Sequence, residues 1–210
     1  MSISRRGFIA AVFGLWVGVT LQTPPVQADE FTDGAQKFIS TLSDRAQKSL
    51  LIENITLKER QNRFRVLMLD TFDLNGVAKW VLGRYWRRAS RQEQQQYLNL
   101  FEEFIIATFT KRFKAYINAN LQISETTSRK SSAFVKTRIN RSSAKPIRII
   151  WRVKFTDGRY QIIDIVVEGV SWIQTQRSEF VSVIRNSGGK VSGLIEALDK
   201  KIAFLGSSAS

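Results

Sequence analysis

The chain has 210 residues, 43% of them hydrophobic and 11% aromatic, which is enough for one domain with a buried core. It contains no cysteine and no histidine, which excludes disulfides, thiol nucleophiles, thiolate or imidazole metal sites, and catalysis by Ser-His-Asp or Cys-His sets. The formal net charge is +14, from 32 Lys and Arg against 18 Asp and Glu, so we expect an acidic or phosphate-rich partner.

The first residues have the organisation of an export leader. Arg5 and Arg6 precede an apolar run over residues 8–21, and the segment ending at Ala28 resembles a small-residue cleavage site. The run is shorter than the roughly 20 apolar residues that a membrane span needs. We predict that residues 1–28 are a signal peptide, cleaved near Ala28-Asp29.

Export has consequences for localisation and partners. The remaining residues, 29–210, are expected to form a single domain in the periplasm. Residues 4–9 also resemble a twin-arginine export motif, so both this route and ordinary secretion stay open. An exported chain does not meet nucleic acid, and we therefore expect its basic surface to face anionic lipid or an acidic protein.

Apolar side chains recur at helical spacing in two parts of the chain. Asp73 is a candidate N-cap, and Ser90 with Glu93 forms a capping box before the longest helix, whose aromatic face is unusually wide. The expected helices cover residues 31–51, 57–69, 73–83, 90–117, 173–186 and 192–205.

Between the two helical parts the period changes to two, which predicts strands over residues 121–126, 133–141, 145–156 and 160–168. The dipeptide Asp157-Gly158 predicts a tight hairpin. That turn places Trp151 opposite Asp164 and predicts three further pairs: Ile149 with Val166, Val153 with Ile162, and Phe155 with Tyr160. The sequence thus favours an α+β fold: N-terminal helices, a four-stranded antiparallel twisted sheet (a meander), C-terminal helices, and an apolar pocket between sheet and helices.

Three stretches resemble the MlaC family, or toluene-tolerance auxiliary family, of periplasmic phospholipid-binding proteins. They are Phe72-Asp73 with residues 81–90, residues 164–171 continuing to 176–180, and residues 188–195. The likeness covers most of residues 31–205. Gln176 and Tyr160 depart from the family pattern, which often has tyrosine and tryptophan there, and relatives beside hopanoid-synthesis genes widen the range of ligands.

The resemblance implies a monomeric carrier with no cofactor and no enzymatic activity. Such a carrier would shuttle phospholipid, or a hopanoid-like amphiphile, between an inner-membrane MCE/ABC transporter complex and an outer-membrane lipoprotein complex. Outer-membrane lipid asymmetry would be the process it serves.

We predict that the pocket wall consists of bulky apolar residues from the long helix, the short helix before it and the sheet, with Trp151 and Phe104 facing each other. Ordinary core packing is the alternative for each of them. The predicted wall residues are Trp80, Leu82, Phe101, Phe104, Ile105, Phe109, Ile149, Trp151, Val153, Ile162, Val166 and Val170.

Arg84, Trp86 and Arg87 are predicted to lie at the mouth of the pocket, because guanidinium groups bind phosphate bidentately. Alternatively, Trp86 supports the long helix and both arginines are solvated.

Two other functions are open. A strip of Lys and Arg along the strands could bind an anionic polymer: Arg129, Lys130, Lys136, Arg138, Arg141, Lys145 and Arg148. Asp164 with a lysine or tyrosine could serve a hydrolase, although a lone carboxylate without an identified partner is more often structural.

Overall fold

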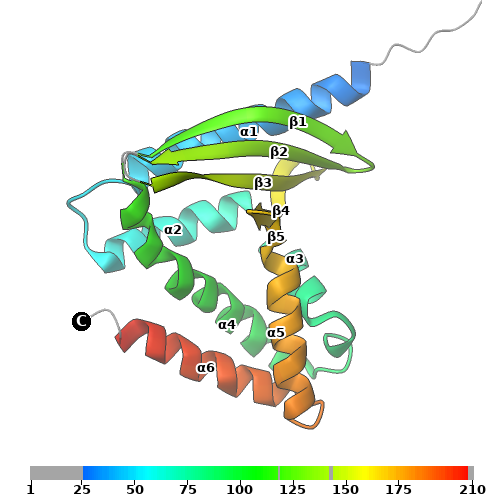
Figure 1. The fold of residues 1–210 in the computed structure, drawn as a ribbon. Coiled ribbons are helices and arrows are strands. Elements are labelled where there is room, and N and C mark those ends of the chain that lie inside the picture. Colours follow the sequence, from blue (N-terminus) through cyan, green and yellow to red (C-terminus); the bar gives the residue numbers. More distant parts are fainter. Residues whose placement is uncertain (1–25, 118, 142–143, 208–210) are drawn as a thin grey trace, which may run out of the picture.

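In the computed structural model, one antiparallel sheet lies at one end of the molecule and most helices extend away from it (Figure 1). The structure describes residues 26–117, 119–141 and 144–207. The predicted α+β class is confirmed. The helical elements are α1 (Val26–Ser49), α2 (Leu57–Thr71), α3 (Leu74–Leu82), the 3-10 turn η1 (Gly83–Tyr85), α4 (Arg91–Phe109), the 3-10 segment η2 (Thr110–Tyr116), α5 (Trp172–Asn186) and α6 (Val191–Ser207).

The predicted helix starts are confirmed at α3 and α4. The Asp73 carboxylate accepts a hydrogen bond from the Gly76 N–H at 3.0 Å. Ser90 and Glu93 exchange the two bonds of a capping box at 3.2 and 2.8 Å. These side chains satisfy backbone donors that lack partners in the first turn of a helix, so local sequence determines where both helices begin.

The helix predicted over residues 90–117 is not the longest, since α1 has 24 residues and α4 has 19. α4 ends before residue 117, because the chain changes to 3-10 geometry at Thr110. The buried Thr110 hydroxyl donates to the Ile106 carbonyl at 2.6 Å, and threonine bonds of this kind bend helices. Beyond the change, the Phe113 ring meets the Phe64 ring of α2 edge-on, with centroids 4.8 Å apart.

The sheet has the order β1-β2-β3-β4-β5, with all neighbours antiparallel. The predicted meander is therefore correct, but the predicted number of four strands is wrong by one. The fifth strand has only two residues and returns along β4 after Glu168 and Gly169, both with positive φ. The strands are β1 (Asn120–Arg129), β2 (Ser132–Arg141), β3 (Ala144–Thr156), β4 (Arg159–Val167) and β5 (Val170–Ser171).

A β-bulge follows Arg152 in the pairing of β3 with β4. The prediction that Trp151 lies opposite Asp164 is wrong: Asp164 pairs with Arg152, and Trp151 pairs with Ile165. The bulge adds one residue to β4, which strict alternation does not reveal. It also moves the partner of Ile149 to Val167. Between the bulge and the hairpin turn the predicted pairs are confirmed, Val153 with Ile162 and Phe155 with Tyr160.

One hydrophobic cluster, which we call the sheet cluster, joins α1 to the apolar face of the sheet. Tyr160 stacks between Phe31 and Phe38 of α1 at 5.9 and 6.1 Å, and Gly34 leaves room for the Tyr160 ring. α1 therefore lies along the sheet, as Figure 1 shows. The buried members are Ala35, Ile39, Leu42, Leu50, Leu67, Ala133, Val135, Val153 and Ile162.

A second cluster, the helix cluster, joins α3, η1, α4, α5 and α6 to Met68 of α2. Its centre is Phe180 of α5, whose ring lies 5.7 to 6.4 Å from those of Tyr97, Phe101 and Phe104 of α4. The buried members are Met68, Val77, Ala78, Val81, Leu82, Tyr85, Tyr97, Phe101, Phe104, Ile105, Ile106, Ile173, Phe180, Ile184, Val191, Leu194 and Leu198.

Most of the predicted leader, residues 1–25, lies outside the described residues, and α1 begins at Val26. Across the described ranges, no helix combines the length and apolar character needed to cross a membrane. The same ranges contain no group of three or more acidic side chains placed to hold a metal ion.

Candidate functional site

The predicted wall residues are divided between the two clusters. Phe104 packs against Phe180 at 5.7 Å, whereas Trp151 packs against the sheet cluster and its Nε1 donates to the Thr137 hydroxyl at 2.9 Å. The prediction that Trp151 and Phe104 face each other is therefore wrong, because α4 packs against other helices. Leu82, Phe101, Phe104 and Ile105 belong to the helix cluster with Phe109 against it, and Val153 and Ile162 belong to the sheet cluster.

The four other predicted wall residues lie outside both clusters. Ile149 is buried on β3, and Val166 is partly buried on β4. Trp80 and Val170 lie at the surface, with exposed fractions of 44% and 62%. These last two do not contribute to the buried interior.

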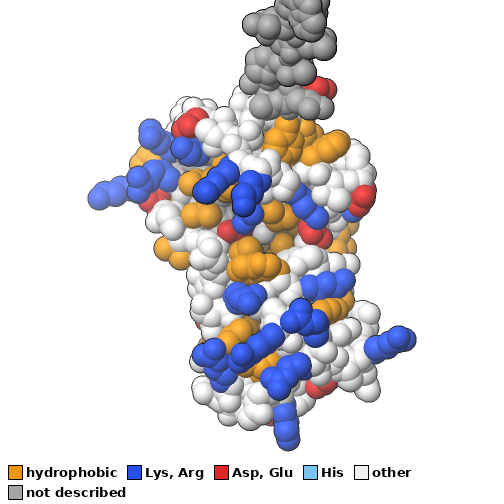
Figure 2. Space-filling view, turned by 90° about the vertical axis from the view of Figure 1, so that its right-hand side faces the viewer, with side chains coloured by type: hydrophobic (Ala, Val, Ile, Leu, Met, Phe, Trp, Pro, Cys, Tyr) orange, Lys and Arg blue, Asp and Glu red, His pale blue; other side chains and the backbone are white. Residues whose placement is uncertain are grey.

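The predicted mouth residues lie in the connection between α3 and α4. Arg84 and Arg87 are exposed, and Arg84 donates to the Tyr85 hydroxyl at 3.1 Å. Trp86 packs against the helix cluster, and the Lys79 ammonium lies 5.4 Å from its ring centroid. This arrangement matches the alternative in which Trp86 supports the helices. Lys and Arg side chains lie over both the upper and the lower parts of the face in Figure 2.

The two clusters meet along α2. Leu67 belongs to the sheet cluster and its neighbour Met68 to the helix cluster, while Phe64 and Phe72 pack against both. We call these four residues the seam. None of them is among the predicted wall residues, yet the seam is where buried apolar groups of the sheet adjoin those of the helices.

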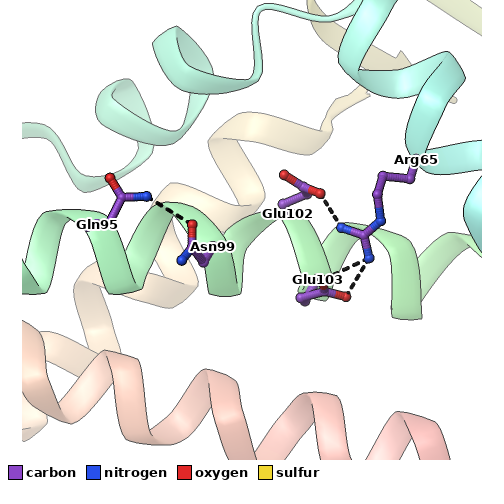
Figure 3. A network of polar contacts seen from close by, with 5 residues as sticks. All are labelled: Arg65, Gln95, Asn99, Glu102 and Glu103. Atoms are coloured by element: carbon purple, nitrogen blue, oxygen red, sulfur yellow. Dashed lines mark hydrogen bonds and ion pairs between the residues drawn. The ribbon is translucent and has the colours of Figure 1, made fainter.

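Polar contacts hold α2 to α4 on another side of α2 (Figure 3). Arg65 donates to both carboxylate oxygens of Glu103 at 2.8 and 2.9 Å, and it also pairs with Glu102. Burial alone would lower the pKa of Arg65, but the bonds to the two glutamates raise it above its usual value. Because these side chains are partly exposed, the network contributes only about 1 kcal/mol to stability.

A buried arginine lies on the seam side of α2, one turn before Phe64. Arg60 is only 1% exposed, and its Nη2 donates to the Ile52 carbonyl at 2.7 Å. Its buried Nη1 has no hydrogen-bond partner among the described residues. Sequence reasoning missed Arg60, although its spacing of four from Phe64 and eight from Met68 places it on the apolar stripe of α2.

Two hollows reach the seam from outside. An open groove of about 540 Å³ between α1 and α2 is lined in part by Leu67. A hollow of about 390 Å³ beside α3 and α4 is lined in part by Phe72. The seam residues themselves are packed against protein, so any ligand at the seam must separate the two clusters.

Two of the stretches quoted from the sequence meet at one corner. Gly83 of η1 has a φ of 55°, and a Cβ there would lie 2.5 Å from the Arg177 guanidinium. Arg177 of α5 donates to the Trp80 carbonyl and stacks over the Trp80 ring at 4.7 Å. Glycine is favoured at this position mainly by its backbone angle, and a larger residue would also have to displace the end of the Arg177 side chain.

Asp164 is a structural residue of the same corner. Its carboxylate accepts bonds from the Ser171 hydroxyl at 2.6 Å and from the Ile173 N–H at 3.3 Å. Ser171 in turn caps α5 by accepting from the Gln174 N–H at 3.2 Å. With both carboxylate oxygens engaged in holding the β4–α5 connection, Asp164 is not placed as a general base.

Phe72 and Asp73 connect the helices to the sheet. The Asp73 N–H donates to the Ile162 carbonyl at 3.0 Å, and the Asp73 carboxylate pairs with Lys154 of β3 at 2.7 Å. Burial raises the pKa of Asp73, but the bonds from Lys154 and Gly76 outweigh it, so the pKa falls below its usual value.

The basic strip along the strands is partly neutralised. Lys136 pairs with Glu125 at 2.8 Å, and Arg148 pairs with Glu168 at 3.0 Å. A polymer-binding strip needs free cations, so these pairs weaken that alternative.

Comparison with known proteins identifies the family. The family model described as MlaC protein matches residues 35–200. The intermembrane phospholipid transport system binding protein MlaC of Haemophilus influenzae is 21% identical over 155 residues, covering 70% of this chain and 72% of that protein. The phospholipid-binding protein from Ralstonia solanacearum, solved in complex with a phospholipid, matches with a TM-score of 0.75 at 21% identity, covering 82% of this chain and 98% of that one. The chain therefore belongs to the MlaC family.

Proposed function

We propose that this protein is a periplasmic phospholipid carrier that holds acyl chains between the sheet cluster and the helix cluster. The observation that carries the proposal is the common fold with the Ralstonia protein, whose structure contains a phospholipid and which this chain covers over 98% of its length. Acyl chains would enter along the seam, flanked by the predicted wall residues of both clusters.

The energetics favour a carrier. Each buried CH₂ contributes about 0.8 kcal/mol, so two chains of about 16 carbons supply roughly 25 kcal/mol before costs. Separating the two clusters and ordering the lipid reduce this gain, and non-covalent affinity rarely exceeds about 20 kcal/mol in any case. The large gross gain is enough to displace side-chain contacts at the seam.

Binding and release require no chemistry. Asp164, the candidate acid for a hydrolase, is engaged by Ser171 and Ile173, and the chain has no histidine or cysteine. We infer that the protein acts without catalysis and without a cofactor.

The carrier would exchange lipid with membrane complexes on either side of the periplasm. We propose an inner-membrane MCE/ABC transporter complex and an outer-membrane lipoprotein complex as partners. The excess of Lys and Arg over Asp and Glu, which persists without Arg5 and Arg6 of the predicted leader, fits docking to acidic surfaces of such partners or to anionic headgroups.

Mass spectrometry tests the proposal directly. The full chain, expressed with its leader and purified from the periplasm, is expected to carry one diacyl lipid per protein by native mass spectrometry. Organic extraction then distinguishes a phospholipid from a hopanoid. If no lipid copurifies and the delipidated protein takes none from phospholipid vesicles, the carrier function is wrong. Steeply salt-dependent binding of an anionic polymer instead would favour the alternative function.

A further inference from the structure

A buried positive charge without a counter-ion needs an explanation. Among the described residues, Arg60 takes part in none of the ion pairs, which all join other side chains. One terminal nitrogen donates to Ile52, and the other is buried with no partner in the described part of the chain. Burying an unpaired charge is costly, and an arginine remains charged in any protein environment. Arg60 therefore destabilises the fold unless something else compensates its charge.

The position of Arg60 indicates what that compensating group is. Arg60 and Phe64 lie one turn apart on the same side of α2, and Phe64 packs against both clusters. Phe113 of η2 covers the Phe64 ring edge-on. A buried cation followed by an apolar seam matches a molecule with an anionic head and hydrocarbon tails.

We propose that Arg60 binds the phosphate of the carried phospholipid, with the acyl chains extending from it along the seam. The inference rests on the proposed carrier function and assigns the headgroup site within it. The bond from Nη2 to Ile52 anchors the guanidinium, and Nη1 is left as a buried donor with no partner among the described residues. Guanidinium groups are well suited to phosphate because their donors form a rigid fork.

Neighbouring Arg63 provides a matched control. It lies on the same helix three residues later, is 36% exposed at the side chain, and pairs with Glu59 at 2.6 Å. Its charge is compensated within the protein, so it needs no ligand. An effect common to Arg60 and Arg63 would reflect general electrostatic attraction, while an effect confined to Arg60 would identify a specific contact.

The test compares full-length wild type with Arg60→Met, Arg60→Lys and Arg63→Met. Each delipidated protein is titrated with phosphatidylglycerol, phosphatidylethanolamine and a diacylglycerol that has the same acyl chains but no phosphate. We expect Arg60→Met to weaken binding of both phospholipids by about 10- to 100-fold, since hydrogen bonds to charged groups are worth about 1.5–3 kcal/mol. Diacylglycerol binding should be unchanged, Arg60→Lys should lose less, and Arg63→Met should change less than threefold.

Thermal unfolding without lipid separates this role from a structural one. Because Arg60→Met removes an uncompensated charge, its melting temperature should be no lower than that of Arg63→Met. A lower melting temperature with equal losses for phospholipid and diacylglycerol would show that Arg60 only supports the fold. Unchanged phospholipid affinity would likewise overturn the headgroup site, while leaving the carrier function intact.

Two further outcomes would contradict the proposal in other ways. Inorganic phosphate that binds wild type as tightly as phospholipid would identify Arg60 as a site for free phosphate. If wild type binds none of the three lipids, the carrier function fails, and the headgroup site fails with it.

Discussion

Buried charged groups differ in their hydrogen bonding between two regions. These are the corner where η1 meets α5 and the seam side of α2. At the corner, Asp164 has two hydrogen-bond donors and Arg177 has both a carbonyl and an aromatic ring. On α2, Arg60 has one carbonyl, and its other terminal nitrogen has no partner within residues 26–117, 119–141 and 144–207. The corner contains the residues that stand out in the sequence, and the structure gives them structural roles.

This difference shows where to look for binding. Residues whose polar groups are satisfied within the protein hold the fold together, and a ligand would have to compete with those bonds. A charged group that is buried and unsatisfied is stabilised only when something binds it. Gln176 of α5 also has a buried oxygen without a partner among the residues that the structure describes, but this group is neutral, so leaving it unpaired costs less.

The largest expected effect at the corner comes from Asp164→Ala. It leaves the Ser171 hydroxyl and the Ile173 N–H without their acceptor, so we expect the free energy of unfolding to fall by about 3 kcal/mol. Urea denaturation measures the change. Asp70→Ala is the control, because Asp70 forms an exposed ion pair with Arg45 and should lose at most about 1 kcal/mol. Equal losses for the two variants would contradict the structural role of Asp164.

Gly83→Ala should have the next largest effect. A Cβ at this positive-φ position would meet the Arg177 guanidinium, and we expect a loss of about 2 kcal/mol in unfolding free energy. Gly206→Ala serves as the control, since a Cβ there meets open space and helix propensity should make it neutral or slightly stabilising. Because the corner has a structural role, Gly83→Ala should keep the phospholipid affinity of the wild type. A selective loss of phospholipid binding would place the headgroup near η1 instead.

The smallest effect concerns the pH dependence of the link between α3 and the sheet. The pKa of Asp73 is lower in the folded protein than in the unfolded chain, so its contribution is present at neutral pH and is lost as pH falls through the folded pKa. Asp73→Asn should therefore cost about 1 kcal/mol at pH 7, and this cost should shrink as pH falls below the pKa of the unfolded chain and vanish below the lower pKa of the folded protein. Denaturation curves of both proteins at several pH values measure this difference. A cost that is independent of pH would mean that the ion pair with Lys154 contributes nothing.

Much of the fold could be predicted because its signals are local. Capping residues determine the starts of α3 and α4, and Asp157-Gly158 determines the β3–β4 hairpin. The bulge after Arg152 and the two-residue strand β5 depend on how neighbouring segments pair in space, so alternation alone could not reveal them.

The candidate site was harder to predict. Periodicity shows which face of a helix or strand is buried, but it does not show which element packs against that face. The aromatic stripe of α4 predicted burial correctly, but Phe104 packs against Phe180 and not against the sheet. On α2, Arg60 is surrounded in sequence by other charged residues, which obscures its spacing from Phe64 and Met68. The structure shows that Arg60 is 1% exposed, whereas Arg63 is 36% exposed at the side chain and pairs with Glu59.

The central claim is that acyl chains occupy the seam, and site-specific photocrosslinking tests it most directly. A benzophenone amino acid replaces Phe64, which packs against both clusters, or Val66, which is 66% exposed on α2. After illumination with bound phospholipid, mass spectrometry should find a lipid adduct at position 64 and little at position 66. Adducts at position 66 alone, or equal yields at both positions, would contradict the account.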